Sequence, residues 1–240
     1  MSQLVAEEIN LLVSYNPATG EKVGEVAVTP VKEIDAIVTK AKAASAHWRT
    51  FTLEERAELL KQAGEKLVEK SEELGRLLTL EMGKPLPAGI GEVKGCGKAI
   101  PHAVDEMAAA LAPIEREDKY STTTQYYDPF GVCAAITPWN FPVGMPQWMV
   151  LPALMAGNAV ILKPSEETPL VAQGYVDVLN EFLPKEVLQT VHGADAQGKA
   201  LVNANVDLIA FTGSREAGKH ILGAASDGLK RVILELGGKD

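Results

Sequence analysis

Two polar side chains in apolar surroundings are the candidates for catalysis. Glu235 ends the apolar run of "VILELGGKD", from Val232 to Asp240, and stands directly before a glycine pair. In a complete enzyme a carboxylate in such a place can act as a general base, a role that burial between apolar strands would favour by raising its pKa. Asn140 is the only amide in the proline-bracketed loop "TPWNFP". Either it fixes the loop by bonding to backbone, or its N–H₂ group donates to a developing oxyanion.

Two further loops carry groups suited to a nucleotide. In "ILKPSEE", Lys163 follows an apolar run and Pro164 forces a turn. Lys163 can hydrogen-bond ribose hydroxyls and Glu166 can accept from them; the alternative is a solvated charged loop. Gly213 and Ser214 end another apolar run where a helix is expected to begin. The free N–H groups there, the positive end of the helix dipole and the serine hydroxyl suit a pyrophosphate without a metal.

Two glycine-containing segments nearly fit the phosphate loop of nucleotide triphosphatases. They are "GADAQGKA" and "GSREAGKH", which begin at Gly193 and Gly213. That motif needs Ser or Thr after its lysine to hold magnesium, but Ala200 and His220 occupy these positions. We therefore expect neither a triphosphatase nor a metal site. The glycines can also serve only to let a strand turn into a helix.

The cysteines and histidines show no pattern that indicates catalysis. Cys133 lies inside the apolar run "VCAAI", where cysteine is expected to pack as a small hydrophobic residue. Cys96 lies in "GCG", within an expected helix, and has no evident base nearby in the sequence. The four histidines match no triad or metal motif; they are His47, His102, His192 and His220.

Composition and charge exclude several classes of protein. The chain has 240 residues, a net charge of −9 and a pI near 5.1, so nucleic acid is not an expected partner. The two cysteines suggest no disulfide framework, and "MSQLVAEEIN" lacks the features of a signal peptide. These features favour the cytoplasm. No charged residue occurs from Pro129 to Leu162, but four prolines interrupt this segment, so we expect a buried strand, a loop and a buried helix rather than a membrane span.

The elements around these residues alternate in type. Residues 1–28 are expected to form short strands and turns, and helices follow. Thr52 and Glu55 form a capping-box pattern, Ser71 restarts the apolar periodicity, and another helix is expected over much of 88–111. The segment 113–131 is rich in β-branched and aromatic residues, which predicts an extended ribbon of the kind that pairs with another subunit.

A βα rhythm begins after Gly131. The apolar runs "VCAAIT", "AVILK", "VLQTV", "VDLIAFT" and "RVILEL" are each followed by a loop rich in Pro, Gly, Ser or Asn. Near-continuous apolar strands that alternate with helices predict an α/β fold, with a parallel sheet covered on both faces. Such sheets bind ligands at the carboxyl ends of their strands, which is where the candidate residues lie.

The ordered set of motifs resembles the aldehyde dehydrogenase superfamily. The motifs are "NPATGE", "LEMGKP", "TPWNFP", "AGNAVILKPSEETP", "FTGS" and "LELGGK". The resemblance runs from about residue 12 to residue 240, and "LEMGKPLPAGIGEV" is most similar to the succinate-semialdehyde branch. It implies a Rossmann-like NAD(P)-binding domain over residues 1–240, with 113–131 as an oligomerisation arm in a homo-oligomer.

The resemblance also implies roles for individual residues. Asn140 would bind the oxyanion, Glu235 would activate water for deacylation, and Lys163 and Glu166 would hold the adenosine ribose. The full cofactor-binding set that it implies is Thr137, Pro138, Trp139, Lys163, Ser165, Glu166, Gly198, Phe211, Thr212, Gly213, Ser214 and Leu236. Glu166 permits NAD, whereas Lys163 and Ser165 could accept the 2′-phosphate of NADP, so either cofactor is expected.

The activity that the resemblance implies is oxidation of an aldehyde to its acid by a cysteine thiolate, with hydride transfer to NAD or NADP. In the family, that cysteine lies downstream of the glutamate in "LELGGK". The resemblance therefore implies that these 240 residues hold most of the cofactor-binding half and are inactive alone. The alternative is a non-catalytic nucleotide-binding or interaction module that kept the fold.

Overall fold

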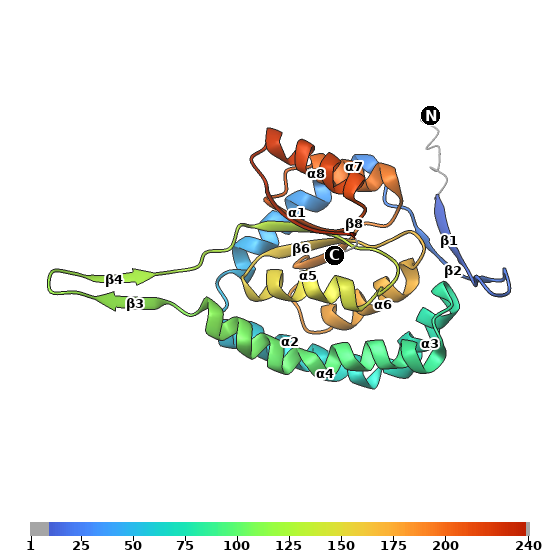
Figure 1. Ribbon diagram of the computed structural model, residues 1–240, viewed down its shortest axis with the longest axis horizontal. Helices are drawn as coiled ribbons and strands as arrows, with labels where there is room; N and C mark the ends of the chain where they lie inside the picture. The colour runs from blue at the N-terminus through green and yellow to red at the C-terminus, as the bar shows by residue number, and fades with distance from the viewer. Residues whose placement is uncertain (1–9, 239–240) are drawn as a thin grey trace, which may run out of the picture.

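A five-stranded parallel sheet forms the centre of the protein, with helices on both faces (Figure 1). The computed structural model describes residues 10–238; the beginning of the first expected strand segment and the last two residues of "GGKD" lie outside them. The sheet strands are β5 (Val132–Ile136), β6 (Ala159–Lys163), β7 (Leu188–Thr190), β8 (Leu208–Gly213) and β9 (Arg231–Leu236). The α/β fold expected from the apolar runs is confirmed.

The strand order creates a crevice at one point of the sheet. The order is β7-β6-β5-β8-β9, and all neighbouring pairs are parallel. The chain therefore winds outward from β5 to β7 in one direction and then crosses to β8 and β9 in the other. The loops that follow β5 and β8 diverge, and a crevice opens between them at the carboxyl edge. The first candidate loop, "TPWNFP", begins there.

Alternation along the strands produces two hydrophobic cores. Cys133 and Ala135 face one core, while Val132 and Ala134 face the other. The first core lies under α5 (Gly144–Met155) and α6 (Pro169–Asn180), and the second lies under α1 (Ile34–Trp48), α7 (Asp195–Asn203) and α8 (Arg215–Asp227). Because every residue of β5 and β6 from Val132 to Ala135 and from Ala159 to Lys163 is buried, the strands read as continuous apolar runs.

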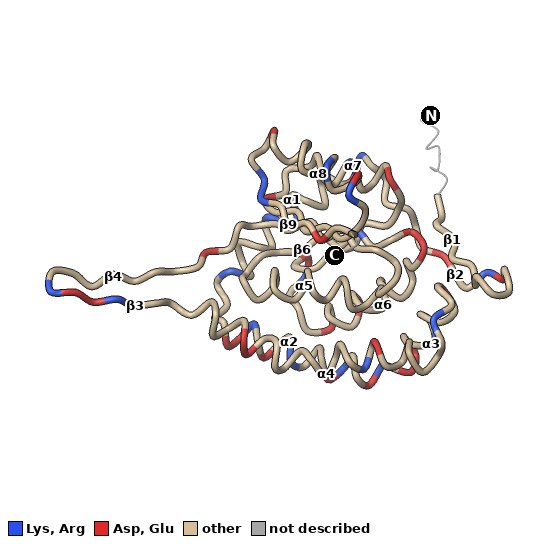
Figure 2. The backbone as a smooth tube through the Cα atoms, viewed as in Figure 1, with Lys and Arg blue, Asp and Glu red and all other residues tan. Residues whose placement is uncertain are grey.

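A second helical layer packs against α5 and α6 (Figure 1). It consists of α2 (Leu53–Glu69), α3 (Ser71–Met82) and α4 (Leu86–Leu111). The predicted capping box of Thr52 and Glu55 begins α2. Helix α3 ends at Gly83, whose φ of 78° is left-handed and favours glycine. Figure 2 shows Lys and Arg interspersed with Asp and Glu along α2 and α4.

The uncharged segment from Pro129 to Leu162 contains β5, a loop, α5 and most of β6, as expected. Between residues 10 and 238, no helix has both the length and the apolar character needed to cross a membrane.

The expected ribbon is an antiparallel hairpin that projects from the body (Figure 1). Strands β3 (Ile114–Glu117) and β4 (Thr122–Gln125) pair from Ile114 with Gln125 to Glu117 with Thr122, and nearly all their residues are exposed. A second hairpin joins β1 (Leu11–Tyr15) to β2 (Lys22–Ala27). A short 3₁₀ helix, Val31–Glu33, precedes α1.

Candidate functional site

Two hollows lie at the carboxyl edge of the sheet. The larger, which we call the Asn140 hollow, has a volume of about 820 Å³. The loops after β5 and β8 and the end of β9 surround it. Its lining residues are Pro138, Trp139, Asn140, Met145, Trp148, Met149, Thr212, Gly213, Ile233, Glu235, Leu236 and Gly237. The structure thus brings both catalytic candidates into one cavity.

The smaller cavity, the Lys163 hollow, has a volume of about 430 Å³. It lies between the end of β6 and the helices α7 and α8. Its lining residues are Ile136, Lys163, Glu166, Ala194, Asp195, Gly198, Lys199, Val202, Phe211, Ala217, His220 and Ile221. The expected ribose-binding pair therefore lines a cavity and is not merely part of a solvated loop.

Lys163 and Glu166 form the polar side of the Lys163 hollow. The Lys163 side chain is only 7% exposed, and its Nζ donates to Glu166 Oε2 at 3.1 Å. Strand β6 ends at Lys163, and Pro164 then turns the chain so that Glu166 comes back over the strand end. The Thr137 N–H donates to the Lys163 carbonyl at 3.2 Å. This bond joins the loop after β5, which lines the Asn140 hollow, to the end of β6, which lines the Lys163 hollow.

Two glycines leave space for a ligand or for a neighbouring ring. A Cβ added at Gly198, in α7, would meet no heavy atom within 4 Å, so the side chain of a larger residue would enter the Lys163 hollow. A Cβ added at Gly213 would lie 2.4 Å from Cζ of Phe211. Glycine at 213 therefore lets the Phe211 ring lie beneath the strand end between the two hollows.

Three expected cofactor residues line neither hollow. Thr137 is buried, and its hydroxyl oxygen has no hydrogen-bond partner among the described residues. Ser165 Oγ accepts from the Glu167 N–H at 3.3 Å and stabilises the turn. Ser214 is the N-cap of α8, as the strand-to-helix pattern predicted, and its Oγ accepts from the Ala217 N–H at 3.2 Å.

Glu235 is exposed in the part of the chain that the structure describes. It lies on β9, opposite Thr212 of β8. Among the described strands, β9 is at the edge of the sheet and has β8 as its one neighbour. Its Glu235 side faces the open Asn140 hollow instead of a helix. Asn140 is exposed on the other side of the same hollow.

Burial strongly affects the titration of His192, which lies near Lys163. Burial, followed by the nearby charge of Lys163, lowers the pKa of His192 to about 4, while Asp177 acts in the opposite direction. Its Nε2 lies 2.7 Å from Gln173 Oε1. The ring therefore remains neutral in the folded protein at pH values where an exposed histidine is charged.

Between pH 6.5 and pH 4, His192 should make the fold less stable as the pH falls. In this range the unfolded chain binds a proton at this residue and the folded chain does not, so acidification favours unfolding by up to about 3 kcal/mol. We expect His192→Gln to show a shallower loss of unfolding free energy over this range in denaturant titrations. Titration of the carboxylates affects both proteins equally, so it cancels when their unfolding free energies are subtracted. Identical pH slopes would contradict the assignment.

The two cysteines are poor nucleophiles in their surroundings. Cys133 is fully buried in β5, and burial raises the pKa of its thiol to about 12. Cys96, on α4, is half-buried, and burial together with the nearby Glu92 raises the pKa of its thiol to about 12. Neither lines the Asn140 hollow.

Within residues 10–238, no three His, Cys, Asp or Glu side chains are arranged to hold a metal ion.

Sequence reasoning did not identify several residues of the hollows. The apolar side of the Asn140 hollow includes Met145, Trp148, Met149 and Ile233. Trp148 is 73% exposed. Helix α5 carries apolar residues on all its faces, and this pattern could have indicated that one face lines something other than the core. The Lys163 hollow also includes His220 and the Asp195–Lys199 pair. No comparable pattern in the sequence indicated these residues.

Comparison with known proteins gives a consistent result. The model for the aldehyde dehydrogenase family matches residues 5–240. The chain is 38% identical over 234 residues to malonate-semialdehyde dehydrogenase from Lacticaseibacillus casei, covering 94% of this chain and 46% of the relative. It is 39% identical over 229 residues to mitochondrial succinate-semialdehyde dehydrogenase from Arabidopsis thaliana, covering 93% of this chain and 43% of the relative. The chain thus spans about half the length of the curated relatives it matches.

Solved structures match the fold closely. PnpE in complex with nicotinamide adenine dinucleotide superimposes with a TM-score of 0.90 at 33% identity, covering 96% of this chain and 48% of that one. NADP-dependent glyceraldehyde-3-phosphate dehydrogenase from Bacillus halodurans, complexed with NADP, superimposes with a TM-score of 0.89 at 30% identity, covering 96% and 50%. Together with the family match over nearly the whole sequence, these similarities show that the chain belongs to the aldehyde dehydrogenase family.

Proposed function

We propose that the protein acts in the NAD(P)-dependent oxidation of a semialdehyde to its acid, and that residues 1–240 supply the nucleotide site. The observation that carries this proposal is the pair of hollows at one sheet edge. One contains the Lys163–Glu166 pair, and the other contains Asn140 and Glu235. The relatives that act on malonate and succinate semialdehydes support the substrate class, and the solved NAD and NADP complexes support the cofactor.

The described residues fit a dinucleotide. Gly198 leaves the Lys163 hollow open, and Lys163 and Glu166 offer a donor and an acceptor for ribose hydroxyls. Gly213 and Ser214 bring the N-terminus of α8 to the edge of the Asn140 hollow, where N–H groups and the helix dipole suit the pyrophosphate. The nicotinamide would then lie in the Asn140 hollow, beside Leu236. There the cofactor supplies the chemistry of accepting a hydride.

Glu166 favours NAD over NADP in this arrangement. Its carboxylate can accept a hydrogen bond from the ribose 2′-hydroxyl, whereas it would repel a 2′-phosphate. Lys163, whose Nζ lies 3.1 Å from the Glu166 carboxylate, would offset part of that repulsion. We therefore propose use of both nucleotides, with NAD bound more tightly.

Asn140 and Glu235 have separate tasks in the proposed reaction. The Asn140 amide would donate to the oxygen of the aldehyde as negative charge develops on it. Glu235 would take a proton from the water that hydrolyses an acyl-enzyme thioester. Exposure of Glu235 to the hollow gives water access to its carboxylate. Both tasks depend on a cysteine thiolate that neither Cys96 nor Cys133 can provide in these surroundings.

Gly198→Leu should weaken NADH binding by about tenfold or more, because the new side chain would occupy part of the Lys163 hollow. Gly223→Leu is the matched control. Gly223 is also a helical glycine with no heavy atom within 4 Å of an added Cβ, but it lies on α8 and does not line the hollow. Calorimetric titration should show NADH binding to the unaltered chain and to Gly223→Leu. Equal affinities of all three proteins, or no binding by the folded unaltered chain, would contradict the proposed site.

The projecting hairpin of residues 113–131 is proposed to pair with another copy of the chain. Its strands have free edges, and its base carries the exposed side chains of Tyr126, Tyr127 and Phe130. Free edges and exposed aromatic groups both favour association. Replacing 114–125 with a short Gly-Ser turn should reduce the mass measured by light scattering. An unaltered chain that is already monomeric, or a shortened chain of unchanged assembly state, would oppose this role.

A further inference from the structure

The helices that follow the two site loops receive their N-terminal caps from a distant part of the chain. Glu92 Oε1 accepts from the N–H groups of Val143 and Gly144, both at 3.1 Å, at the start of α5. Glu81 Oε1 accepts from Leu170 N–H at 3.0 Å at the start of α6. Neither helix has a cap from its own N-cap side chain. The carboxylates therefore satisfy N–H groups that the local sequence leaves unpaired.

Both carboxylates belong to the hairpin of α3 and α4. Glu81 is near the end of α3, and its Oε2 also accepts from Val171 N–H at 2.7 Å. Glu92 lies in α4, and both side chains are nearly fully buried. Helix α5 follows the loop that holds Asn140, and α6 follows the loop from Lys163 to Glu166. The hairpin of α3 and α4 thus contacts the starts of both helices that follow the site loops.

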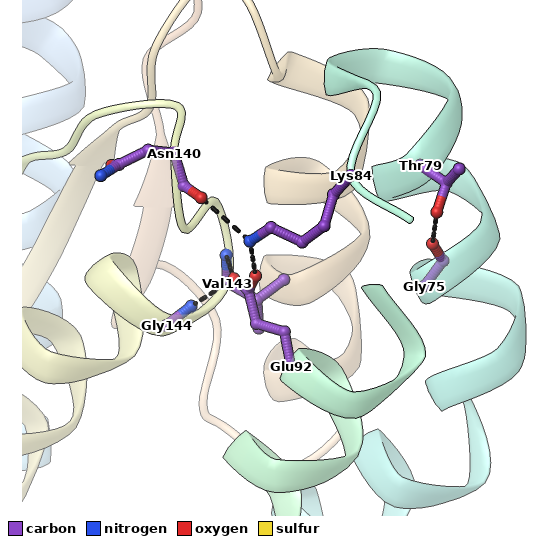
Figure 3. A network of polar contacts seen from close by, with 7 residues as sticks. All are labelled: Gly75, Thr79, Lys84, Glu92, Asn140, Val143 and Gly144. Atoms are coloured by element: carbon purple, nitrogen blue, oxygen red, sulfur yellow. Dashed lines mark hydrogen bonds and ion pairs between the residues drawn. The ribbon is translucent and has the colours of Figure 1, made fainter. Parts of the chain in front are cut away.

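Lys84 extends the first of these contacts to Asn140 itself (Figure 3). Its Nζ donates to Glu92 Oε2 at 2.5 Å and to the Asn140 carbonyl oxygen at 3.0 Å, and it lies 4.0 Å from the centre of the Phe141 ring. Lys84 is 14% exposed and Glu92 6% exposed, so solvent screens this ion pair weakly. In Figure 3 the Asn140 carbonyl faces Lys84 while the Asn140 side chain points away.

We propose that Lys84 with Glu92, and Glu81 separately, are positioning residues for the two halves of the nucleotide site. The Lys84–Glu92 pair fixes the backbone of Asn140 and thereby the direction in which its amide donates. Glu81 fixes the start of α6 and with it the loop that carries Lys163 and Glu166. The inference rests on the proposed function for the identity of the ligand, but the division into two loops rests on the contacts alone.

A purely structural role predicts a different pattern of effects. If the two carboxylates only stabilised the fold, replacing either would loosen α3, α4 and both loops together. If each positions its own loop, the effects separate. Glu92→Gln keeps the size of the side chain but places an N–H₂ group against either Lys84 or the two N–H groups of α5. Glu81→Gln keeps one acceptor and loses the other, so these two variants form a matched pair.

Hydrogen exchange followed by mass spectrometry on the unaltered chain and both variants tests the separation. Glu92→Gln should speed amide exchange over residues 139–145 by about tenfold, the effect of losing one charge-assisted hydrogen bond, and leave 165–171 unchanged. Glu81→Gln should do the reverse. Lys84→Arg should retain slow exchange near Asn140, whereas Lys84→Met should not. Equal acceleration of both segments in both variants, or no acceleration in either, would overturn the proposal.

Ligand binding gives the second readout, with ADP-ribose and NADH as the probes. Glu92→Gln should bind ADP-ribose as the unaltered chain does but bind NADH about fivefold more weakly, because the affected loop lines the nicotinamide side. Glu81→Gln should weaken both ligands equally. If both variants lost affinity for ADP-ribose and NADH to the same extent, the assignment of Glu92 and Glu81 to separate halves of the site would be overturned. If the unaltered chain binds neither probe, the proposed nucleotide function fails, and the exchange experiment alone then decides the positioning role.

Discussion

Residues 1–240 should form no NADH or NADPH when they are supplied with oxidised cofactor and an aldehyde such as succinate semialdehyde. The proposed reaction begins with a thiolate, and burial raises the pKa of both thiols, at Cys96 and Cys133, to about 12. At pH 7 such a thiol is ionised to roughly one part in 10⁵. Neither sulfur lines the Asn140 hollow, so the aldehyde would not meet even this small fraction. The absorbance of reduced nicotinamide measures the result directly.

The controls for this expected absence of turnover use the two cysteines and Glu235. Cys96→Ser and Cys133→Ala, alone and together, should leave the background rate unchanged, and so should Glu235→Gln. A folded preparation that binds added NADH but produces no NADH from NAD and the aldehyde would agree with the prediction. Sustained turnover by residues 1–240 that Cys96→Ser abolishes would show that the half-buried thiol acts as the nucleophile after all.

The strands could be predicted because the sheet is covered on both faces. From Val132 to Ala135 every side chain is buried, so the run is apolar without alternation, which is the pattern that parallel strands under helices produce. The hairpin of residues 113–131 was predictable for the opposite reason: its residues are exposed and retain strand-forming types. The placement of Lys163 and Gly213 followed from the ends of such runs.

Contacts between distant segments could not be predicted in this way. Glu81 is 89 and 90 residues from the N–H groups it caps, and Glu92 is 51 and 52 residues from its own. No periodicity within one helix indicates which remote helix end a carboxylate will meet. The exposure of Glu235 in residues 10–238 could not be predicted for a related reason. An apolar run indicates a strand, but it does not indicate whether that strand lies at the edge of the sheet, as β9 does.

Lys163→Ala should weaken NADH binding by about 10- to 100-fold, the largest effect on affinity that we expect from one substitution. Hydrogen bonds to a charged group contribute about 1.5–3 kcal/mol when they are shielded from water, and the Lys163 side chain is only 7% exposed. The substitution also leaves the Glu166 carboxylate without the cation that lies 3.1 Å from it. The unpaired carboxylate would repel the 2′-phosphate of NADPH, so NADPH should lose more affinity than NADH.

Lys199→Ala provides the matched control for this prediction, because Lys199 lines the same hollow and also pairs with a carboxylate. Its Nζ lies 2.7 Å from Asp195, but both side chains are more than half exposed. Exposed pairs contribute little, so its removal should change NADH affinity by less than about threefold. Calorimetry on both variants, with thermal melts to verify folding, separates a buried ligand-binding lysine from general positive charge. Equal losses in the two variants would mean that Lys163 acts only through charge, and a larger loss for Lys199→Ala would place the ribose elsewhere in the hollow.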